Sequence, residues 1–192
     1  MLAQKNTSSL VLPPLNPADP LPAVDLIIVT HNEDVALLRK TVNAATHINY
    51  PDKQKLNIVI ADDQNRPEVH ALALEYGVQW IGMTENHHAK SGNVNHALAQ
   101  LDAPLFAIFD ADMIPFSGFL TDTVPFFIQN FHDLANEKKD VKPLGFVQTP
   151  QSFYNPDIFQ FNLFSEKIIS NEQDFFSRDI NVLNGINENA LF

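Results

Sequence analysis

Two aspartates separated by one alanine, Asp110 and Asp112, are the residues of this sequence that most directly suggest chemistry. They follow the apolar run 105–109, so we expect them in a turn at the end of a strand. Hard divalent cations such as Mg²⁺ and Mn²⁺ prefer oxygen ligands and often link one or two carboxylates to substrate phosphates. The plainer alternative is a turn whose aspartates cap the next helix. The apolar run before Asp110 favours a metal site in which both carboxylates are ligands.

A second acidic pair, Asp62 and Asp63, follows another apolar run at residues 56–61. These carboxylates could accept hydrogen bonds from a ribose or a base, or add to the field around a metal; a solvated turn is the alternative. Thr30 and Glu33 follow a third apolar run and could also contact a base or ribose. An acidic first turn of a helix would equally explain Glu33.

Residues 87–96 (HHAKSGNVNH) are dense in hydrogen-bond donors. Their glycine allows close backbone approach, and a helix beginning beside it offers free N–H groups to an anion. Lys90 supplies a mobile positive charge for a phosphate. The spacing of His87, His88 and His96 does not match that of zinc ligands, so surface histidines are the favoured interpretation and their role stays open.

The run 148–157 (QTPQSFYNPD) places aromatic side chains beside amides. A sugar ring offers both an apolar face and hydroxyl groups, so this composition suits a carbohydrate. A proline-rich loop that packs its aromatics on the core is the alternative. The Phe-rich, amphipathic segment 157–180 is typical of a core or an interface, and an interfacial helix at a membrane is also consistent with it.

Hydrophobic periodicity predicts the elements that position these residues. Buried strands are expected at residues 24–30, 56–61, 78–82, 105–109 and 144–149. Helices are expected at 33–45 with Asn32 as N-cap, at 67–76 between Pro67 and Gly77, at 91–101, and at 119–130 with a perturbation at Pro125, followed by an exposed loop at 132–143. Alternation of strands with helices predicts an α/β fold with a mostly parallel sheet, which binds ligands outside the carboxyl ends of its strands.

Composition excludes several classes of protein. The 192 residues carry 12 Lys and Arg against 23 Asp and Glu, a net charge of -11, which argues against a nucleic-acid partner. The 45% hydrophobic content excludes a disordered chain, and the absence of cysteine excludes disulfides and thiolate chemistry. No apolar run reaches the roughly 18 residues of a transmembrane helix, and the N-terminus lacks the apolar core of a signal peptide.

Five segments, taken in order, resemble the catalytic domain of processive family 2 glycosyltransferases, most closely those of the bacterial cellulose synthase type. The matching segments are VDLIIVTHNEDVALLRKTV, HINYPDKQKLNIVIADDQNRPEV, NHHAKSGNVNHAL, FDADMIPFSGFL and VQTPQSFYNPD. They cover about residues 24–160. The resemblance implies a GT-A-type fold that holds a UDP-sugar at the strand ends.

The resemblance also implies roles for single residues on the donor side. Thr30, Glu33 and one of Asp62 and Asp63 would lie beside the uridine. Lys90 would face the base or the diphosphate of the donor.

The same resemblance implies that Asp110 and Asp112 bind Mg²⁺ or Mn²⁺, with Asp110 also contacting the nucleotide-sugar. Gln148, Thr149 and Pro150 would border the region of sugar and acceptor. The implied chemistry is an inverting transfer, in which an acceptor hydroxyl attacks the anomeric carbon while the metal stabilises the departing diphosphate.

The sequence departs from the family pattern at several points. His31 stands where the family has Tyr, and Gln64 and Asn65 replace a Gly-Gly pair. The family's general-base Asp, in a Thr-Glu-Asp motif, and its Gln-x-x-Arg-Trp motif are expected beyond Phe192, since neither occurs in the sequence. We therefore expect no catalytic residue in this chain and no polymer synthesis by it alone.

We therefore expect three parts. Residues 1–23, with five prolines, are expected to form a linker, and residues 24–160 a nucleotide-sugar-binding region. Residues 161–192 are expected to be an amphipathic segment that leads into a missing acceptor half. The leading hypothesis is the donor-binding part of a glucosyltransferase that uses UDP-glucose to extend a β-1,4-glucan at the cytoplasmic face of a membrane. The glucan acceptor and the membrane contacts would involve parts outside this chain, which by itself would be a soluble cytosolic domain.

Three alternatives remain. One is a chitin- or hyaluronan-type synthase that uses UDP-N-acetylglucosamine, and another is a non-catalytic relic that binds nucleotide-sugar. A metal-dependent phosphotransferase is disfavoured because Thr30 and His31 stand where a nucleophilic Asp would follow the first strand.

Overall fold

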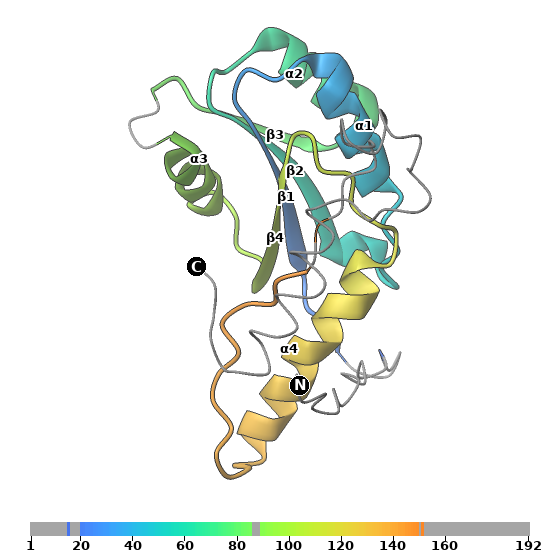
Figure 1. Cartoon of the computed structure of the whole chain (residues 1–192), viewed down its shortest axis with the longest axis vertical. Helices are drawn as coiled ribbons and strands as arrows, with labels where there is room; N and C mark the ends of the chain where they lie inside the picture. Colours follow the sequence, from blue (N-terminus) through green and yellow to red (C-terminus); the bar gives the residue numbers. More distant parts are fainter. Residues whose placement is uncertain (1–14, 16–19, 86–88, 150, 152–192) are drawn as a thin grey trace, which may run out of the picture. The chain divides into compact units, whose positions relative to one another are not determined.

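The computed structural model describes residues 15, 20–85, 89–149 and 151. These fall into two compact units, and the fold described here is that of residues 12–143, the larger unit. It is built on one sheet of four parallel strands in the order β3-β2-β1-β4 (Figure 1). The strands are β1 (Val24–Thr30), β2 (Leu56–Asp62), β3 (Gln79–Gly82) and β4 (Leu105–Asp110). The predicted parallel α/β sheet is confirmed.

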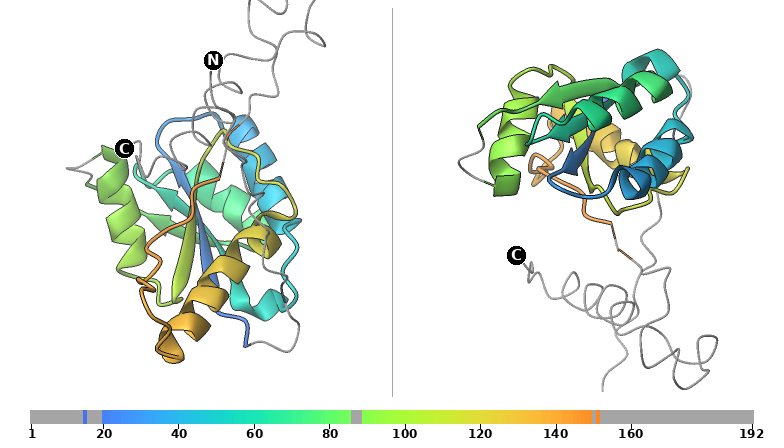
Figure 2. Two further views of the ribbon diagram at one scale, coloured as in Figure 1. Left: turned by 60° about the horizontal axis from the view of Figure 1, so that its bottom comes forward. Right: turned by 90° about the horizontal axis from the view of Figure 1, so that it is seen from above.

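Helices cover both faces of this sheet. They are α1 (Val35–Thr46), α2 (Pro67–Tyr76), α3 (Ala89–Leu98) and α4 (Phe119–Ala135), with a 3-10 turn η1 at Lys53–Lys55. The helices α1, α2 and α4 contribute to one hydrophobic cluster, and α3 packs on the opposite face, as Figure 2 shows for α3 and α4. Within the described residues no helix is both long and apolar enough to cross a bilayer.

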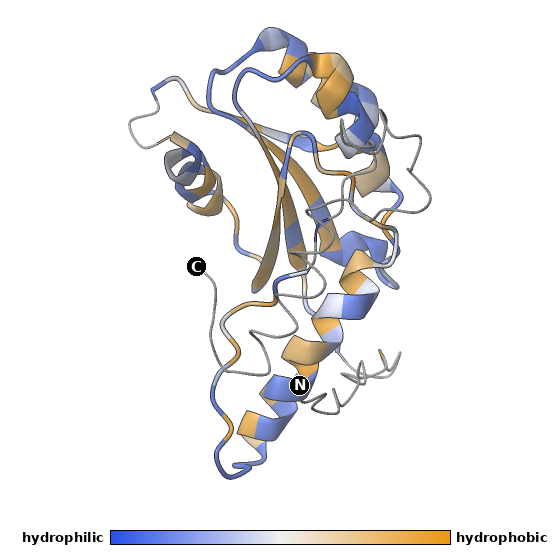
Figure 3. Cartoon of the chain, viewed as in Figure 1, coloured by the Kyte–Doolittle hydropathy of each residue, from blue (hydrophilic) through white to orange (hydrophobic). Residues whose placement is uncertain are grey.

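The continuous apolar run of β1 follows from this two-sided packing. Successive side chains of a strand point to opposite faces, so Leu26 and Ile28 enter one cluster while Ile27 and Val29 enter the other. All seven residues of β1 are buried, and the centre of the sheet is mostly hydrophobic in Figure 3. Because the core holds β1 on both faces, it also fixes the position of the residues that follow this strand.

Several predicted boundaries need correction. Asp34, not Asn32, caps α1: its carboxylate accepts a hydrogen bond from the Ala36 N–H at 2.6 Å, because the helix begins at Val35. The predicted start of α2 at Pro67 and its end at Gly77, which has a φ of 64°, are confirmed. Helix α3 begins two residues earlier than expected and ends at Leu98.

Helix α4 continues past its expected end at residue 130 and takes up the first part of the expected loop 132–143. Pro125 lies inside the helix without ending it. Val124 and Ile128 are buried in the core cluster on either side of this proline. We attribute the continuation to this burial, which outweighs the loss of one helical hydrogen bond.

The fifth strand expected at residues 144–149 is not formed, since these residues carry no regular secondary structure. An apolar run becomes a strand only with a hydrogen-bonded neighbour, which the run itself cannot supply. The Phe-rich segment 157–180 lies outside the described residues.

The residues just before β1 are attached to the core. Leu21 packs against the core cluster, and the carbonyl of Pro22 accepts a hydrogen bond from the Tyr50 hydroxyl.

Candidate functional site

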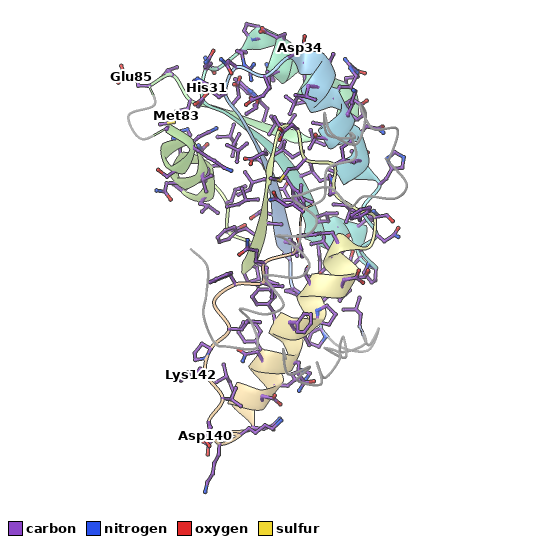
Figure 4. All side chains as sticks on the ribbon, viewed as in Figure 1. His31, Asp34, Met83, Glu85, Asp140 and Lys142 are labelled. Carbon is purple, nitrogen blue, oxygen red and sulfur yellow. The ribbon has the colours of Figure 1, made fainter. Side chains whose placement is uncertain are left out.

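The carboxyl ends of the four strands meet at one edge of the sheet. Thr30 and Asp62 are register partners at the ends of β1 and β2, while Val29 is paired with Asp110 on β4. Figure 4 labels His31, Met83 and Glu85, which follow β1 and β3 at this end of the sheet. The structure therefore brings the predicted residues of three separate segments to one edge.

Arg66, which the sequence analysis did not select, organises this edge. Its Nε donates to Asp62 Oδ1 at 3.0 Å, and its Nη2 donates to Thr30 Oγ1 at 2.7 Å. Its Nη1 donates to the carbonyl of Glu33 at 2.9 Å, and its backbone N–H donates to Asp62 Oδ2 at 2.6 Å. The Asp62 side chain is 0% exposed and that of Arg66 13%. Arg66 thus joins the ends of β1 and β2 through a buried ion pair.

A signal for Arg66 was present in the sequence. A carboxylate at the end of a buried strand requires a cation or donors, because burial of an unpaired charge is unfavourable. Arg66 is the basic residue nearest to Asp62 in the chain, four positions later and directly before the helix-starting Pro67. No motif marked Arg66, and its only signal in the sequence was the need of a buried Asp62 for a cation.

Glu33 extends the same network on the side of β1. Its Oε2 accepts hydrogen bonds from Thr30 Oγ1 at 2.8 Å and from the His31 N–H at 2.7 Å. Burial alone would raise the pKa of Glu33, but the backbone N–H groups of His31 and Glu33, the Thr30 hydroxyl and the charge of Arg66 together lower it below the usual 4.5. The Thr30 hydroxyl therefore accepts from Arg66 and donates to Glu33.

The lowered pKa of Glu33 predicts a pH-dependent contribution to stability. A carboxylate whose pKa is lower in the folded chain stabilises the fold above the unfolded pKa, and the contribution disappears as pH falls through the folded pKa. Glu33→Gln should lower the free energy of unfolding at pH 7 by less than about 1 kcal/mol, since the group is only partly buried. In urea unfolding, the difference in the free energy of unfolding between the wild type and Glu33→Gln should be smaller at pH 3 than at pH 7. Glu137→Gln, at an exposed position, is the control, and a difference that stays constant down to pH 3 would refute the assignment.

His31 and Asp63 form a second pair, which directly follows the strand-end residues Thr30 and Asp62. The Nδ1 of His31 lies 2.8 Å from each carboxylate oxygen of Asp63, and the Gln64 amide nitrogen lies 3.3 Å from the same Nδ1. The Asp63 side chain is 5% exposed, whereas that of His31 is 62% exposed. The imidazole is therefore held at one edge and open to solvent elsewhere.

Helix α3 brings Lys90 to the strand ends. Asn93, which is buried, donates through Nδ2 to the carbonyls of Ala61 at 2.8 Å and of Thr30 at 3.3 Å, and so ties α3 to the ends of β2 and β1. One turn earlier on the helix, the Lys90 ammonium forms an ion pair with the Asp110 carboxylate. The predicted phosphate-binding cation and the first predicted metal ligand are thus direct neighbours.

Asp110 and Asp112 could serve as metal ligands, Asp110 being partly exposed and Asp112 exposed. Across the described ranges no group of three or more His, Asp or Glu side chains could hold a metal ion. Two carboxylate donors fit a hard cation that keeps waters and binds phosphate oxygens, as Mg²⁺ and Mn²⁺ do, rather than an all-protein cage.

The remaining predicted residues lie elsewhere or outside the description. Gln148 is exposed and Thr149 partly buried, both in the smaller unit, so their place beside the acceptor stays a prediction. Pro150, His87 and His88 lie outside the described residues. His96, in the last turn of α3, is hydrogen-bonded through Nε2 to the amide of Gln100, which lies just past the end of the helix, at 3.0 Å.

Comparison with known proteins agrees with this fold. The profile of the family described as "Glycosyl transferase family 2" matches residues 25–192. A protein named "Putative cellulose synthase 2" from Komagataeibacter xylinus is 40% identical over 142 residues, which is 74% of this chain and 9% of that protein. A "Cellulose synthase catalytic subunit [UDP-forming]" from Xanthomonas axonopodis pv. citri is 38% identical over 174 residues, 86% of this chain and 22% of that protein. The chain thus spans a small part of the length of these relatives.

A solved structure supports the fold class. The mannosyltransferase PcManGT from Pyrobaculum calidifontis, in complex with GDP-Man and Mn²⁺, has a TM-score of 0.50 and 22% sequence identity. The alignment covers 56% of this chain and 33% of that one. With this similarity the predicted GT-A-type fold is confirmed, and with the profile match and the relatives the resemblance to processive family 2 enzymes is confirmed. This chain belongs to glycosyl transferase family 2.

Proposed function

We propose that the strand-end edge binds a UDP-sugar together with Mg²⁺ or Mn²⁺, and that the chain is the donor-binding part of an inverting glucosyltransferase that extends a β-1,4-glucan. The observation that carries this proposal is the convergence of a Lys90–Asp110 ion pair with the hydrogen-bonded cluster of Thr30, Glu33 and Arg66 at one sheet edge. Such an edge offers a cation for phosphates beside oxygen groups for a nucleoside. The names of the relatives, which include a UDP-forming cellulose synthase subunit, support the choice of donor.

In this proposal each residue has a separate task. Lys90 binds the diphosphate, and Thr30 and Glu33 with one residue of the acidic pair lie beside the uridine. Asp110 and Asp112 hold the cation, which when bound supplies positive charge to the departing diphosphate. Gln148, Thr149 and Pro150 border the acceptor.

The two aspartates of the acidic pair have different roles in this proposal. Both carboxylate oxygens of Asp62 are bonded to Arg66 inside the fold, and its side chain is fully buried. Asp63 lies next to the exposed His31. We therefore assign the ligand side to Asp63, which acts there through the imidazole that it holds, and a supporting role to Asp62.

The transfer itself requires a general base within reach of the acceptor hydroxyl. We assign none to the residues described here and propose that the chain binds its donor without polymerising it. The glucan acceptor and membrane association are proposed for the longer protein rather than for this part.

Titration calorimetry tests donor binding directly. UDP and UDP-glucose should bind in the presence of Mn²⁺, and Lys90→Ala should weaken UDP binding about tenfold because a charge-assisted contact with phosphate is lost. Lys138→Ala is the matched control, since Lys138 is also exposed and ion-paired but lies past the end of α4. UMP should bind more weakly than UDP.

Three outcomes would count against the proposal. Absence of UDP binding at millimolar concentration with Mn²⁺ would contradict it. Tighter binding of UDP-N-acetylglucosamine than of UDP-glucose would favour a chitin- or hyaluronan-type synthase. Equal losses in Lys90→Ala and Lys138→Ala would place the diphosphate elsewhere.

A further inference from the structure

We propose that His31 selects the base of the donor by accepting a hydrogen bond through its Nε2 from the N3–H of uracil. This inference rests on the proposed function of the site and names the residue that would distinguish one pyrimidine from another. Its evidence is the contact between His31 and Asp63 and the exposure of the remaining imidazole.

The first step concerns which residues can reach a ligand. Asp62 is fully buried and its oxygens are bonded to Arg66. Asp63 is 5% exposed and is in contact with the His31 ring, which is 62% exposed. A ligand that approaches the acidic pair therefore meets the imidazole held by Asp63.

The second step fixes the tautomer of this imidazole. An ionised carboxylate only accepts hydrogen bonds, so the nitrogen that faces it must carry the hydrogen. Both Asp63 oxygens lie 2.8 Å from Nδ1, closer than the Gln64 amide nitrogen at 3.3 Å. The neutral ring therefore holds its proton on Nδ1 and leaves Nε2 as an acceptor.

The third step is the place of the ring. His31 directly follows Thr30, the last residue of β1, and its backbone N–H donates to Glu33 at 2.7 Å. The imidazole thus stands beside the hydroxyl and carboxylate that the proposed function assigns to the nucleoside, and Figure 4 shows His31 at this end of the sheet. An acceptor at this place meets the edge of a base rather than its phosphates.

An acceptor at Nε2 distinguishes uracil from cytosine. Uracil presents N3–H as a donor. N3 of cytosine carries a lone pair and no hydrogen, so it would face the lone pair of Nε2 without forming a hydrogen bond. Sites built to hydrogen-bond one group reject an analogue that lacks it, because the polar group of the protein is then left without a partner. We expect a preference of about tenfold for UDP over CDP, since the ring is partly exposed and the gain from one hydrogen bond is modest.

The test compares UDP and CDP binding by calorimetry, with Mn²⁺ present, in the wild type, His31→Phe and His47→Phe. Phenylalanine keeps an aromatic ring but has no acceptor, so His31→Phe should weaken UDP binding about tenfold, leave CDP binding nearly unchanged and bring the ratio close to one. His47→Phe is the control, because this exposed ring lies at the opposite end of α1. Thermal unfolding of each variant checks that the fold is kept.

A spectroscopic readout adds an independent criterion. The ¹⁵N shift of His31 Nε2 should be that of an unprotonated ring nitrogen at pH 8 and should move when UDP is added. If the wild type binds UDP and His31→Phe keeps the preference for UDP over CDP, this inference fails while the proposed function stands. If the wild type binds no uridine nucleotide, the proposed function itself fails, and this inference falls with it.

Discussion

Replacement of Arg66 by alanine should lower the free energy of unfolding by about 3 kcal/mol. The guanidinium holds three groups of the protein at once, and its removal leaves the buried carboxylate of Asp62 without its cation. Loss of one partner of a buried ion pair is costly because the remaining charge is neither solvated nor neutralised. Urea unfolding at pH 7 measures this difference.

Arg66→Lys separates charge from geometry. Lysine keeps the positive charge but cannot bond to Asp62, Thr30 and the Glu33 carbonyl together, because its donors lie on one nitrogen. We expect Arg66→Lys to recover only part of the lost stability. It should also bind UDP more weakly than the wild type, since Thr30 and Glu33 lose their common support.

Arg39→Ala is the matched control for this change. Arg39 is ion-paired with Glu75, and both side chains are well exposed, at 42% and 53%. Exposed pairs contribute little, so the loss should stay below about 1 kcal/mol. Equal losses in Arg39→Ala and Arg66→Ala would mean that Arg66 does not hold the strand ends together.

Much of the fold followed from local patterns. The apolar run predicted β1 correctly, and Pro67 and Gly77 correctly predicted the two ends of α2. These signals are local, because burial and backbone geometry act within a few residues. Alternation of strands and helices then placed Asp62 and Asp110 at the same edge of one sheet. This much needed no knowledge of tertiary contacts.

The remaining features depend on contacts between distant residues. Arg66 acts on Thr30, 36 positions away, and His31 acts on Asp63, 32 positions away, so neither bond has a local signature. The division of labour between Asp62 and Asp63 also required their burial. Residues 144–149 form no strand for a related reason: a strand requires a hydrogen-bonded neighbouring strand, and the local sequence does not reveal whether one is present.

Replacement of Asp110 by asparagine should weaken Mn²⁺-dependent UDP binding by about a hundredfold. The change removes a negatively charged metal ligand, a larger loss than that of a residue which only orients a ligand. It also removes the partner of Lys90, but this ion pair is partly exposed, so the stability of the fold should change by less than about 1 kcal/mol. Asp112→Asn should act in the same direction.

Asp102→Asn is the matched control, because it makes the same change of charge. Asp102 is exposed and precedes β4, so it lies toward the amino end of the strand that Asp110 completes. Its UDP affinity should equal that of the wild type. A loss shared by Asp102→Asn and Asp110→Asn would indicate a general electrostatic effect.

Calorimetric titration of UDP with and without Mn²⁺, in the wild type, Asp110→Asn and Asp102→Asn, tests most directly whether this sheet edge binds a metal-bound diphosphate. The account predicts that Mn²⁺ strengthens UDP binding in the wild type and in Asp102→Asn, and that this gain is lost in Asp110→Asn. UDP binding that is indifferent to Mn²⁺, or a gain that survives in Asp110→Asn, would contradict it.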